Sequence, residues 1–132
     1  MDRLFLDANV LVSAALTPDS SLSRLWTLDS VRLLGSPHVV EEARRNVADP
    51  RASERLEVVL EAVAILPSEP ADFEIEDDPG LPAKDRPVLL AAIVAGADYL
   101  LTGDLTHFGA LVGMGIHGVT VLLPGQYLRT RG

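Results

Sequence analysis

Short apolar runs alternate along this chain with longer stretches in which apolar residues recur at helical spacing. The short runs predict five buried strands, at residues 3–7, 31–34, 64–66, 98–102 and 119–122. The longer stretches predict helices at residues 10–16, 20–29, 37–49, 53–62 and 87–95, then a terminal turn or helix at 124–128. Such alternation is typical of parallel βαβ units. It predicts an α/β fold, a three-layer α/β/α sandwich with a central five-stranded, mainly parallel sheet.

The connections carry residues that begin and end these elements. Ser36-Pro37 opens the helix after the second strand in a favoured way, with serine as N-cap and proline in the first turn. Asp85 precedes Arg86-Pro87 and can cap the helix that follows. Residues 69–78 hold six acids and little apolar content, so we interpret them as a solvated surface loop.

The predicted topology makes the ends of two distant strands neighbours. Right-handed crossovers leave few arrangements, and the simplest puts the first strand in the centre. The second and third strands then lie on one side of it, and the fourth and fifth on the other. Ligands bind at the carboxyl ends of the strands where such an order reverses. Asp7 ends the first strand and Asp104 follows the fourth, so both are expected at this edge.

Length and composition narrow the class of protein. The 132 residues suffice for one domain, 1–132, and 48 % of them are hydrophobic, enough for one core. There is no cysteine, which excludes disulfides, thiolate metal sites and thiol nucleophiles. No apolar run approaches the ~20 residues that span a bilayer, and Met1-Asp2-Arg3 leads directly into a strand-like run. We therefore expect a soluble, cytoplasmic protein with no membrane segment and no signal peptide.

Four acidic residues occupy positions that the predicted fold would bring close together at one edge of the sheet. They are Asp7, Glu42, Asp85 and Asp104. Carboxylates crowded together repel by about 4 kcal/mol per close pair at an effective dielectric near 20, so a cluster needs a cation or bound protons. Carboxylate oxygens favour Mg²⁺ or Mn²⁺. Taken singly, each of these acids is more often a helix cap, a turn residue or a solvated side chain.

Four segments of the chain together resemble the PIN domain, the fold of VapC-type toxin ribonucleases. They are FLDANVLVSA near the start, SPHVVEEARRNV, KDRPVLLAAIVAGADYLLTGD and GVTVLLPGQYL. The resemblance covers nearly the whole chain, and the third segment is its longest and most specific part. The last segment is similar to the end of PIN proteins described as toxin components.

The resemblance implies a function and a set of site residues. The family's acidic quartet falls on Asp7, Glu42, Asp85 and Asp104. Glu41 competes for the second place, but Glu42 keeps the family spacing from Ser36, and neighbours on a helix point about 100° apart. Asp7 and Asp104 are implied as direct ligands of Mg²⁺ or Mn²⁺. In many relatives a further acid follows the last Asp, whereas Thr106-His107 stands here.

The implied activity is cleavage of single-stranded RNA by a metal-dependent endoribonuclease, the toxin of a type II toxin–antitoxin pair. The implied partners are the RNA, a cognate antitoxin protein and a second copy in a homodimer. Secondary candidates for substrate binding are Asn9, Thr102, His107, Arg45 and Arg86. The formal net charge of −8 opposes nucleic-acid binding, although local patches of Arg44, Arg45, Arg51, Arg55 and Lys84 could still attract phosphates.

Other readings stay open at this point. A housekeeping RNA-processing enzyme or a structure-specific DNA nuclease could share the fold and the acids. A receiver-like signalling domain also holds Mg²⁺ at strand ends, but it needs paired acids near the first strand, and Asp7 has no acidic neighbour. A degenerate, protein-binding PIN domain would not need the quartet. An apolar set, Leu22, Leu25, Trp26 and Leu56, could line a dimer or antitoxin surface or belong to the core.

Overall fold

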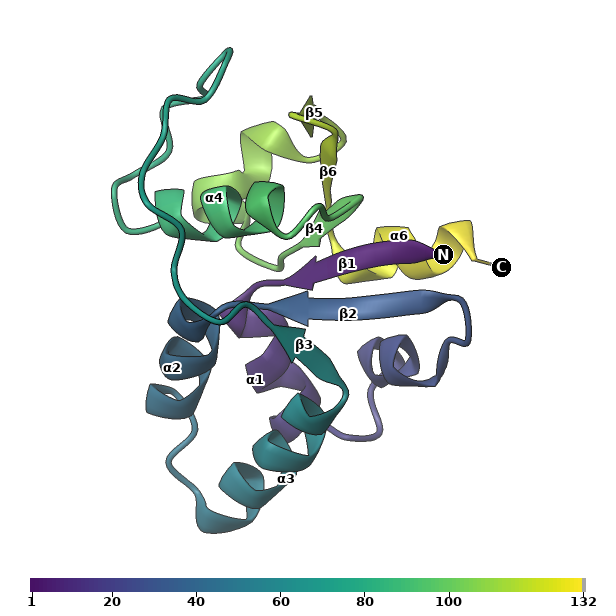
Figure 1. The fold of residues 1–132 in the computed structure, drawn as a ribbon. Helices are drawn as coiled ribbons and strands as arrows, with labels where there is room; N and C mark the ends of the chain where they lie inside the picture. The colour runs from purple at the N-terminus through teal and green to yellow at the C-terminus, as the bar shows by residue number, and fades with distance from the viewer. Residues whose placement is uncertain (132) are drawn as a thin grey trace.

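A single sheet in the order β3-β2-β1-β4-β6-β5 forms the centre of the structure, a computed structural model that describes residues 1–131 (Figure 1). Its strands are β1 (Asp2–Leu6), β2 (Val31–Gly35), β3 (Val63–Ile65), β4 (Tyr99–Leu101), β5 (Gly115–Ile116) and β6 (Val119–Leu122). Within the described chain, only the β5–β6 pair is antiparallel. The central place of the first strand is confirmed. The count of five strands was wrong, because the two-residue β5 is too short to show periodicity.

Helices cover both faces of the sheet. They are α1 (Ala8–Leu16), α2 (Pro37–Arg45), α3 (Pro50–Glu61), α4 (Arg86–Val94), α5 (Leu105–Phe108) and α6 (Pro124–Thr130), with 3₁₀-helices η1 (Ser21–Thr27) and η2 (Gly109–Leu111). Figure 1 shows α1, α2 and α3 on one side of the sheet and α4 on the other. Within residues 1–131, no helix has both the length and the apolar character needed to cross a membrane.

The helix predicted at residues 20–29 is present as the shorter 3₁₀-helix η1 rather than as an α-helix. Its hydroxyl side chains bond to carbonyls three residues back, Ser23 to Ser20 over 2.6 Å and Thr27 to Arg24 over 2.8 Å. Hydroxyls that bond locally compete with regular α-helix hydrogen bonds. The predicted opening of α2 at Ser36-Pro37 is confirmed, because Ser36 Oγ accepts the Val39 N–H.

The register of the central strands places the candidate site. Leu6 of β1 lies beside Leu101 of β4, and both are fully buried. The Asp7 N–H donates to the Leu101 carbonyl over 3.0 Å, so the chain stays paired one residue past β1. Burying each such leucine contributes about 1.5–3 kcal/mol to the free energy of folding. A one-residue slip of the register would expose these side chains and lose that contribution. The residues that follow the two strands therefore emerge side by side.

The apolar set from η1 and α3 belongs mainly to the interior. Leu25 and Leu56 are in the core, while Leu22 and Trp26 are partly buried against it. The Trp26 indole N–H donates to the Val59 carbonyl over 3.0 Å, which fixes η1 against α3. The core interpretation thus holds for Leu25 and Leu56.

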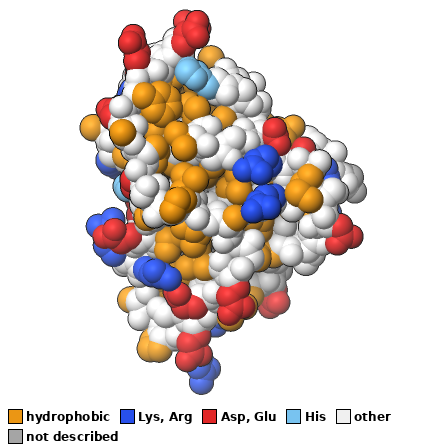
Figure 2. Space-filling view, in the orientation of Figure 1, with side chains coloured by type: hydrophobic (Ala, Val, Ile, Leu, Met, Phe, Trp, Pro, Cys, Tyr) orange, Lys and Arg blue, Asp and Glu red, His pale blue; other side chains and the backbone are white. Residues whose placement is uncertain are grey.

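The acidic segment 69–78 is a loop, as predicted, but it is held to the body of the protein. Arg86 at the start of α4 donates to Asp72 over 2.9 Å and to the Phe73 carbonyl over 2.7 Å, and it also pairs with Asp78. Glu69 accepts the His38 N–H of α2 over 2.9 Å. Figure 2 shows the face of the molecule seen in Figure 1. On that face most acidic side chains lie toward the rim, and hydrophobic side chains lie over the middle.

Candidate active site

A hydrogen-bond network joins the carboxyl ends of β1 and β4. The buried Thr102 hydroxyl donates to Asp7 Oδ2 over 2.8 Å, and the Asn9 amide donates to the same oxygen over 3.2 Å. Asn9 Oδ1 accepts the Gly103 N–H over 2.8 Å. The network orients Asp7 and ties the start of α1 to the end of β4. Thr102 and Asn9, predicted to bind substrate, act in this structure as partners of Asp7.

Asp7 is a buried acid with two roles in the fold. It is only 5 % exposed, and its Oδ1 caps α1 by accepting the Ala8 N–H over 2.8 Å. Burial raises the pKa of Asp7, while its hydrogen bonds from Thr102 and Ala8 oppose the rise. The negative charges of Glu42 and Asp104 raise this pKa further. Ionising Asp7 therefore costs more free energy in the protein than in water, and a nearby cation would lower that cost.

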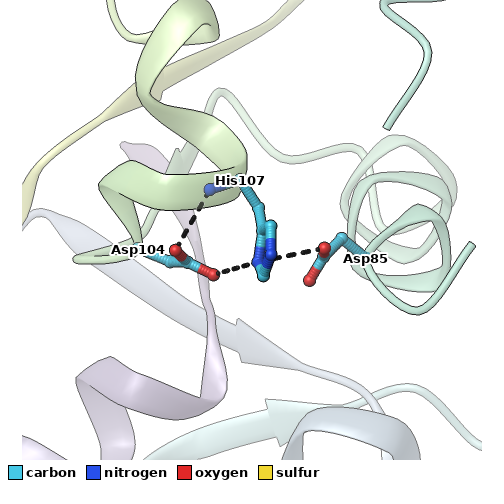
Figure 3. Close-up of side chains that lie close together, drawn as sticks. All are labelled: Asp85, Asp104 and His107. Carbon is cyan, nitrogen blue, oxygen red and sulfur yellow. Dashed lines mark hydrogen bonds and ion pairs between the residues drawn. The ribbon is translucent and has the colours of Figure 1, made fainter. Parts of the chain in front are cut away.

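His107 lies between two further acids (Figure 3). Its Nδ1 is 2.8 Å from Asp104 Oδ2 and 3.2 Å from Asp85 Oδ2. A ring nitrogen carries at most one proton, and the hydrogen bond goes to Asp104. Asp85 Oδ2 is buried and has no hydrogen-bond donor within residues 1–131, although the imidazole is at ion-pair distance. Asp85 occupies the N-cap position of α4 without a capping hydrogen bond, so the predicted cap is not formed.

Asp104 is fixed from both sides of its carboxylate. Its Oδ1 accepts the His107 backbone N–H over 3.2 Å, which caps the short helix α5, while its Oδ2 contacts the imidazole. Burial alone would raise the pKa of Asp104, but the hydrogen bonds and charge of His107 outweigh it and hold the pKa below its ordinary value. The surroundings of Asp104 therefore favour its ionised form, whereas those of Asp7 oppose ionisation.

A cleft of about 640 Å³ brings the predicted acids together. Its lining includes Asp7, Glu42, Asp85 and Asp104, with Asn9, Ser13, Leu22, Asn46 and Pro124 among the others. Glu42 is half-buried and faces this cleft, whereas Glu41 is exposed and does not line it. The structure therefore places Glu42 beside the other three, as the spacing from Ser36 predicted. Thr102 and His107 are not among the lining residues, but each contacts one or more of these acids.

The predicted basic residues do not join the acids. Within residues 1–131, no lysine or arginine forms an ion pair with any of the four acids of the cleft. Arg86 is engaged by the acidic loop, and Arg44 is paired with Glu57 at 2.7 Å. Arg45 is exposed on the last turn of α2 and does not line the cleft. Within residues 1–131, the negative charge of the cleft is therefore not balanced by any lysine or arginine.

Asn46 is a lining residue that the sequence analysis missed. It follows Glu42 by four residues at the end of α2, and its amide donates to the Glu42 carbonyl over 2.8 Å. Residues four apart on a helix share a face, so this spacing was the available signal. Asn46 thus adds a neutral polar side chain to the part of the lining that comes from α2 and its C-terminal end, where Glu42 is the other lining residue.

The donor atoms of the cleft fit a divalent cation. They are carboxylate oxygens with a nearby amide and hydroxyl, the ligands that Mg²⁺ and Mn²⁺ take in proteins. Asp85, Asp104 and His107 each offer one atom, and these atoms lie within 4.8 Å of one another. The buried Asp85 Oδ2 also accepts no hydrogen bond within residues 1–131, so it is available to a further partner. The fold and these acids define an acidic cleft at the carboxyl ends of a parallel sheet, with donor atoms suited to a divalent cation.

Comparison with known families agrees with this class of site. The PIN domain family model matches residues 3–106, which contain all four acids of the cleft. The chain therefore belongs to the PIN domain family, whose members are typically metal-dependent nucleases. Among curated proteins, none matches the sequence.

Solved structures support the same fold at low sequence identity. VapBC2 from Rickettsia felis, crystallised with a DNA fragment from its promoter, aligns with a TM-score of 0.65 and 15 % identity, covering 90 % of this chain and 96 % of the other. VapC20 from Mycobacterium tuberculosis, a sarcin–ricin loop cleaving toxin, aligns with a TM-score of 0.53 and 17 % identity, covering 78 % and 92 %. At such identities the likeness supports the fold alone.

Proposed function

We propose that this protein is a Mg²⁺- or Mn²⁺-dependent endoribonuclease that cleaves single-stranded RNA. One observation carries the proposal: Asp7, Glu42, Asp85 and Asp104 line a single cleft, and no lysine or arginine of residues 1–131 pairs with them. A protein that needed these acids only for its fold would neutralise them internally. A phosphodiester brings further negative charge, so a divalent ion is needed between the acids and the substrate.

The acids take different parts in the proposed reaction. Asp7 and Asp104 follow adjacent strands and would hold the ion directly, while Glu42 and Asp85 would complete its surroundings or orient water. A bound ion supplies charge neutralisation for the scissile phosphate and a more acidic water. One of the remaining carboxylates accepts the proton of the attacking water. No side-chain nucleophile is required. If the 3′ oxygen is the leaving group, as the resemblance to the PIN family implies, the products would carry a 5′ phosphate and a 3′ hydroxyl.

The substrate is proposed to enter along α2. Arg45 makes no ion pair among the described residues and lies on the same helix as Glu42, so it can contact an RNA phosphate. Such contacts position a strand but read no sequence. Asn46, next to it, can contact a ribose or base inside the cleft. Arg86 can bind RNA only if its ion pairs with the loop open.

The biological role proposed is that of a toxin in a toxin–antitoxin pair. The proposal rests on family membership, and VapBC2 and VapC20 enter it as toxin–antitoxin proteins that share the fold. A cognate antitoxin would then place a cationic segment in the acidic cleft, and the toxin would form a homodimer. Expression of the wild-type protein, but not of the Asp7→Asn variant, should arrest growth. No arrest would favour a housekeeping nuclease.

A cleavage assay tests the enzymatic proposal. Single-stranded RNA oligonucleotides are incubated with metal-free protein, with added Mg²⁺ or Mn²⁺, and with excess EDTA. Cleavage should require the ion, and Asp7→Asn should lower the rate by at least about 100-fold, since a lost ligand removes several kcal/mol of transition-state stabilisation. The fold should persist, because asparagine also caps helices well.

Asp98→Asn provides the matched control for that assay. Asp98 lies at the amino end of β4 and accepts the Arg3 N–H over 2.8 Å, a bond that asparagine can keep. This variant should cleave at the wild-type rate. Metal-dependent cleavage by Asp7→Asn, or equal losses in both variants, would contradict the assignment of the cleft.

A further inference from the structure

His107 contacts two of the four acids of the cleft, and its role is not explained by the functions proposed for those acids. Many PIN domains have an acid in this region, but here an imidazole nitrogen faces two carboxylates. Figure 3 shows the ring between Asp85 and Asp104, with Nδ1 toward both. The ring can be a structural link between α4 and α5, or it can be a ligand.

The distances in this cluster match those between ligand atoms around one ion. Nδ1 is 2.8 Å from Asp104 Oδ2 and 3.2 Å from Asp85 Oδ2. Adjacent ligands of an octahedral ion with metal–ligand distances near 2.1 Å are roughly 3 Å apart. The three atoms therefore need little movement to share a cation.

The hydrogen bonding leaves room for a ligand role. One Nδ1–H can donate to only one acid, and its hydrogen bond is to Asp104, so the buried Asp85 Oδ2 has no donor within residues 1–131. His107 is also fixed to Asp104 through its backbone N–H, so the two ligand groups move as one unit. A cation beside Nδ1 would give Asp85 the partner that the protein itself does not supply.

We propose that His107 Nδ1 is a ligand of the divalent ion and makes this cleft select Mn²⁺ over Mg²⁺. The inference rests on the proposed function and adds the identity of the preferred ion. Mg²⁺ binds oxygen and keeps several waters, whereas first-row transition metals accept imidazole nitrogen as well as carboxylate. A nitrogen among the ligands therefore strengthens Mn²⁺ binding and leaves Mg²⁺ binding nearly unchanged.

Calorimetric titration of metal-free protein with Mn²⁺ and with Mg²⁺ at one fixed pH measures this selectivity. His107→Asn keeps an N–H donor close to the position of Nδ1 but removes the imidazole. It should weaken Mn²⁺ binding by about 10-fold or more and change Mg²⁺ binding less than about threefold. His107→Asp, which restores an acid, should lower the Mn²⁺-to-Mg²⁺ affinity ratio. His38→Asn, whose imidazole is not part of the cluster of Asp85, Asp104 and His107, should behave as wild type.

Pulsed electron paramagnetic resonance of the Mn²⁺ complex gives a readout independent of catalysis and of the variants' stability. Wild type and His38→Asn should show ¹⁴N modulation from a directly bound imidazole, and ¹⁵N-histidine labelling should change it accordingly. His107→Asn should lack it. Bound Mn²⁺ without nitrogen coupling, or equal losses of Mn²⁺ and Mg²⁺ affinity in His107→Asn, would overturn the ligand role and leave the proposed nuclease intact. Failure of wild type to bind either ion would overturn both proposals.

Discussion

The acids at the amino ends of β1 and β4 differ from those at the carboxyl ends in the partners that the protein gives them. At the amino end of β1, Asp2 accepts the Tyr127 hydroxyl over 2.6 Å and lies 3.3 Å from an Arg131 nitrogen. At the amino end of β4, Asp98 accepts the Arg3 N–H. These acids are satisfied by the protein itself, and burial together with the bond to Asp2 raises the pKa of Tyr127 above its ordinary value.

At the carboxyl ends of the same strands, the acids lack cationic partners from lysine or arginine within residues 1–131. Asp7 is buried with a raised pKa, and Asp85 has an oxygen without a donor. At the amino ends, Asp2 thus has a cationic partner and Asp98 a backbone N–H, whereas at the carboxyl ends Asp85 and Asp104 have only the imidazole of His107 as an ionisable partner within residues 1–131. The charge left at the carboxyl ends is a property of the site.

The largest expected effect that separates the two ends is stabilisation by a divalent ion. An ion at 100 times its Kd should add about 2.7 kcal/mol to the free energy of unfolding. In a domain of this length that raises the melting temperature by roughly 10 °C. Asp104→Asn should lose most of this rise, whereas Asp98→Asn should keep it. Thermal melts with Mn²⁺ and with EDTA measure the difference. An equal rise of the melting temperature in both variants would contradict the placement of the ion at the carboxyl ends of the strands.

Removal of an acid at the amino end should affect stability without affecting the cleft. Asp2→Ala leaves the buried Tyr127 hydroxyl without its acceptor and should lower the free energy of unfolding by about 1–2 kcal/mol. Asp2→Asn keeps an acceptor and should lower it less. Urea unfolding measures both variants, and the rate of RNA cleavage should match wild type. A clear loss of cleavage in the folded Asp2→Ala variant would show that the two ends are coupled.

The smallest expected effect is a pH-dependent gain of stability in Asp7→Asn without metal. The pKa of Asp7 is raised in the folded protein, so folding favours its protonated form, and this group destabilises the fold increasingly as pH rises above about 4. Asparagine carries no charge at any of these pH values. Melts in EDTA from pH 4 to 7 should therefore show the variant gaining a few degrees on wild type as pH rises. A difference independent of pH would argue against a buried charge at Asp7.

Much of the fold could be predicted because the sheet is parallel and buried. Apolar runs marked each central strand, and the crossover rules then placed the first strand beside the fourth. Predicted boundaries differ from the observed ones where capping decides them. Helix α3 begins at Pro50 rather than residue 53 because Asp49 accepts the Ala52 N–H over 3.0 Å. The two-residue β5 depends on pairing with β6 and has no pattern of its own.

The candidate site was predictable to the extent that backbone geometry determines it. The end of a strand fixes where Asp7 lies, and helix geometry separates Glu42 from Glu41. The contacts of long side chains could not be predicted in this way. Arg86 flanks Asp85 in sequence, yet its guanidinium turns to Asp72 and Asp78, and this depends on the conformation of an irregular loop. The i, i+3 spacing of Asp104 and His107 was visible in the sequence, but the meeting with Asp85 required the fold.

Asp7 serves two purposes with one carboxylate, since one oxygen caps α1 and the other faces Thr102 at the edge of the cleft. Asparagine can fulfil the first purpose and not the second, and an aspartate codon becomes an asparagine codon by one base change. On the proposed function, a gene for this protein therefore lies a single mutational step from a folded, catalytically silent descendant. Such a descendant could still bind whatever restrains the parent, and selection against a harmful nuclease would reach it easily.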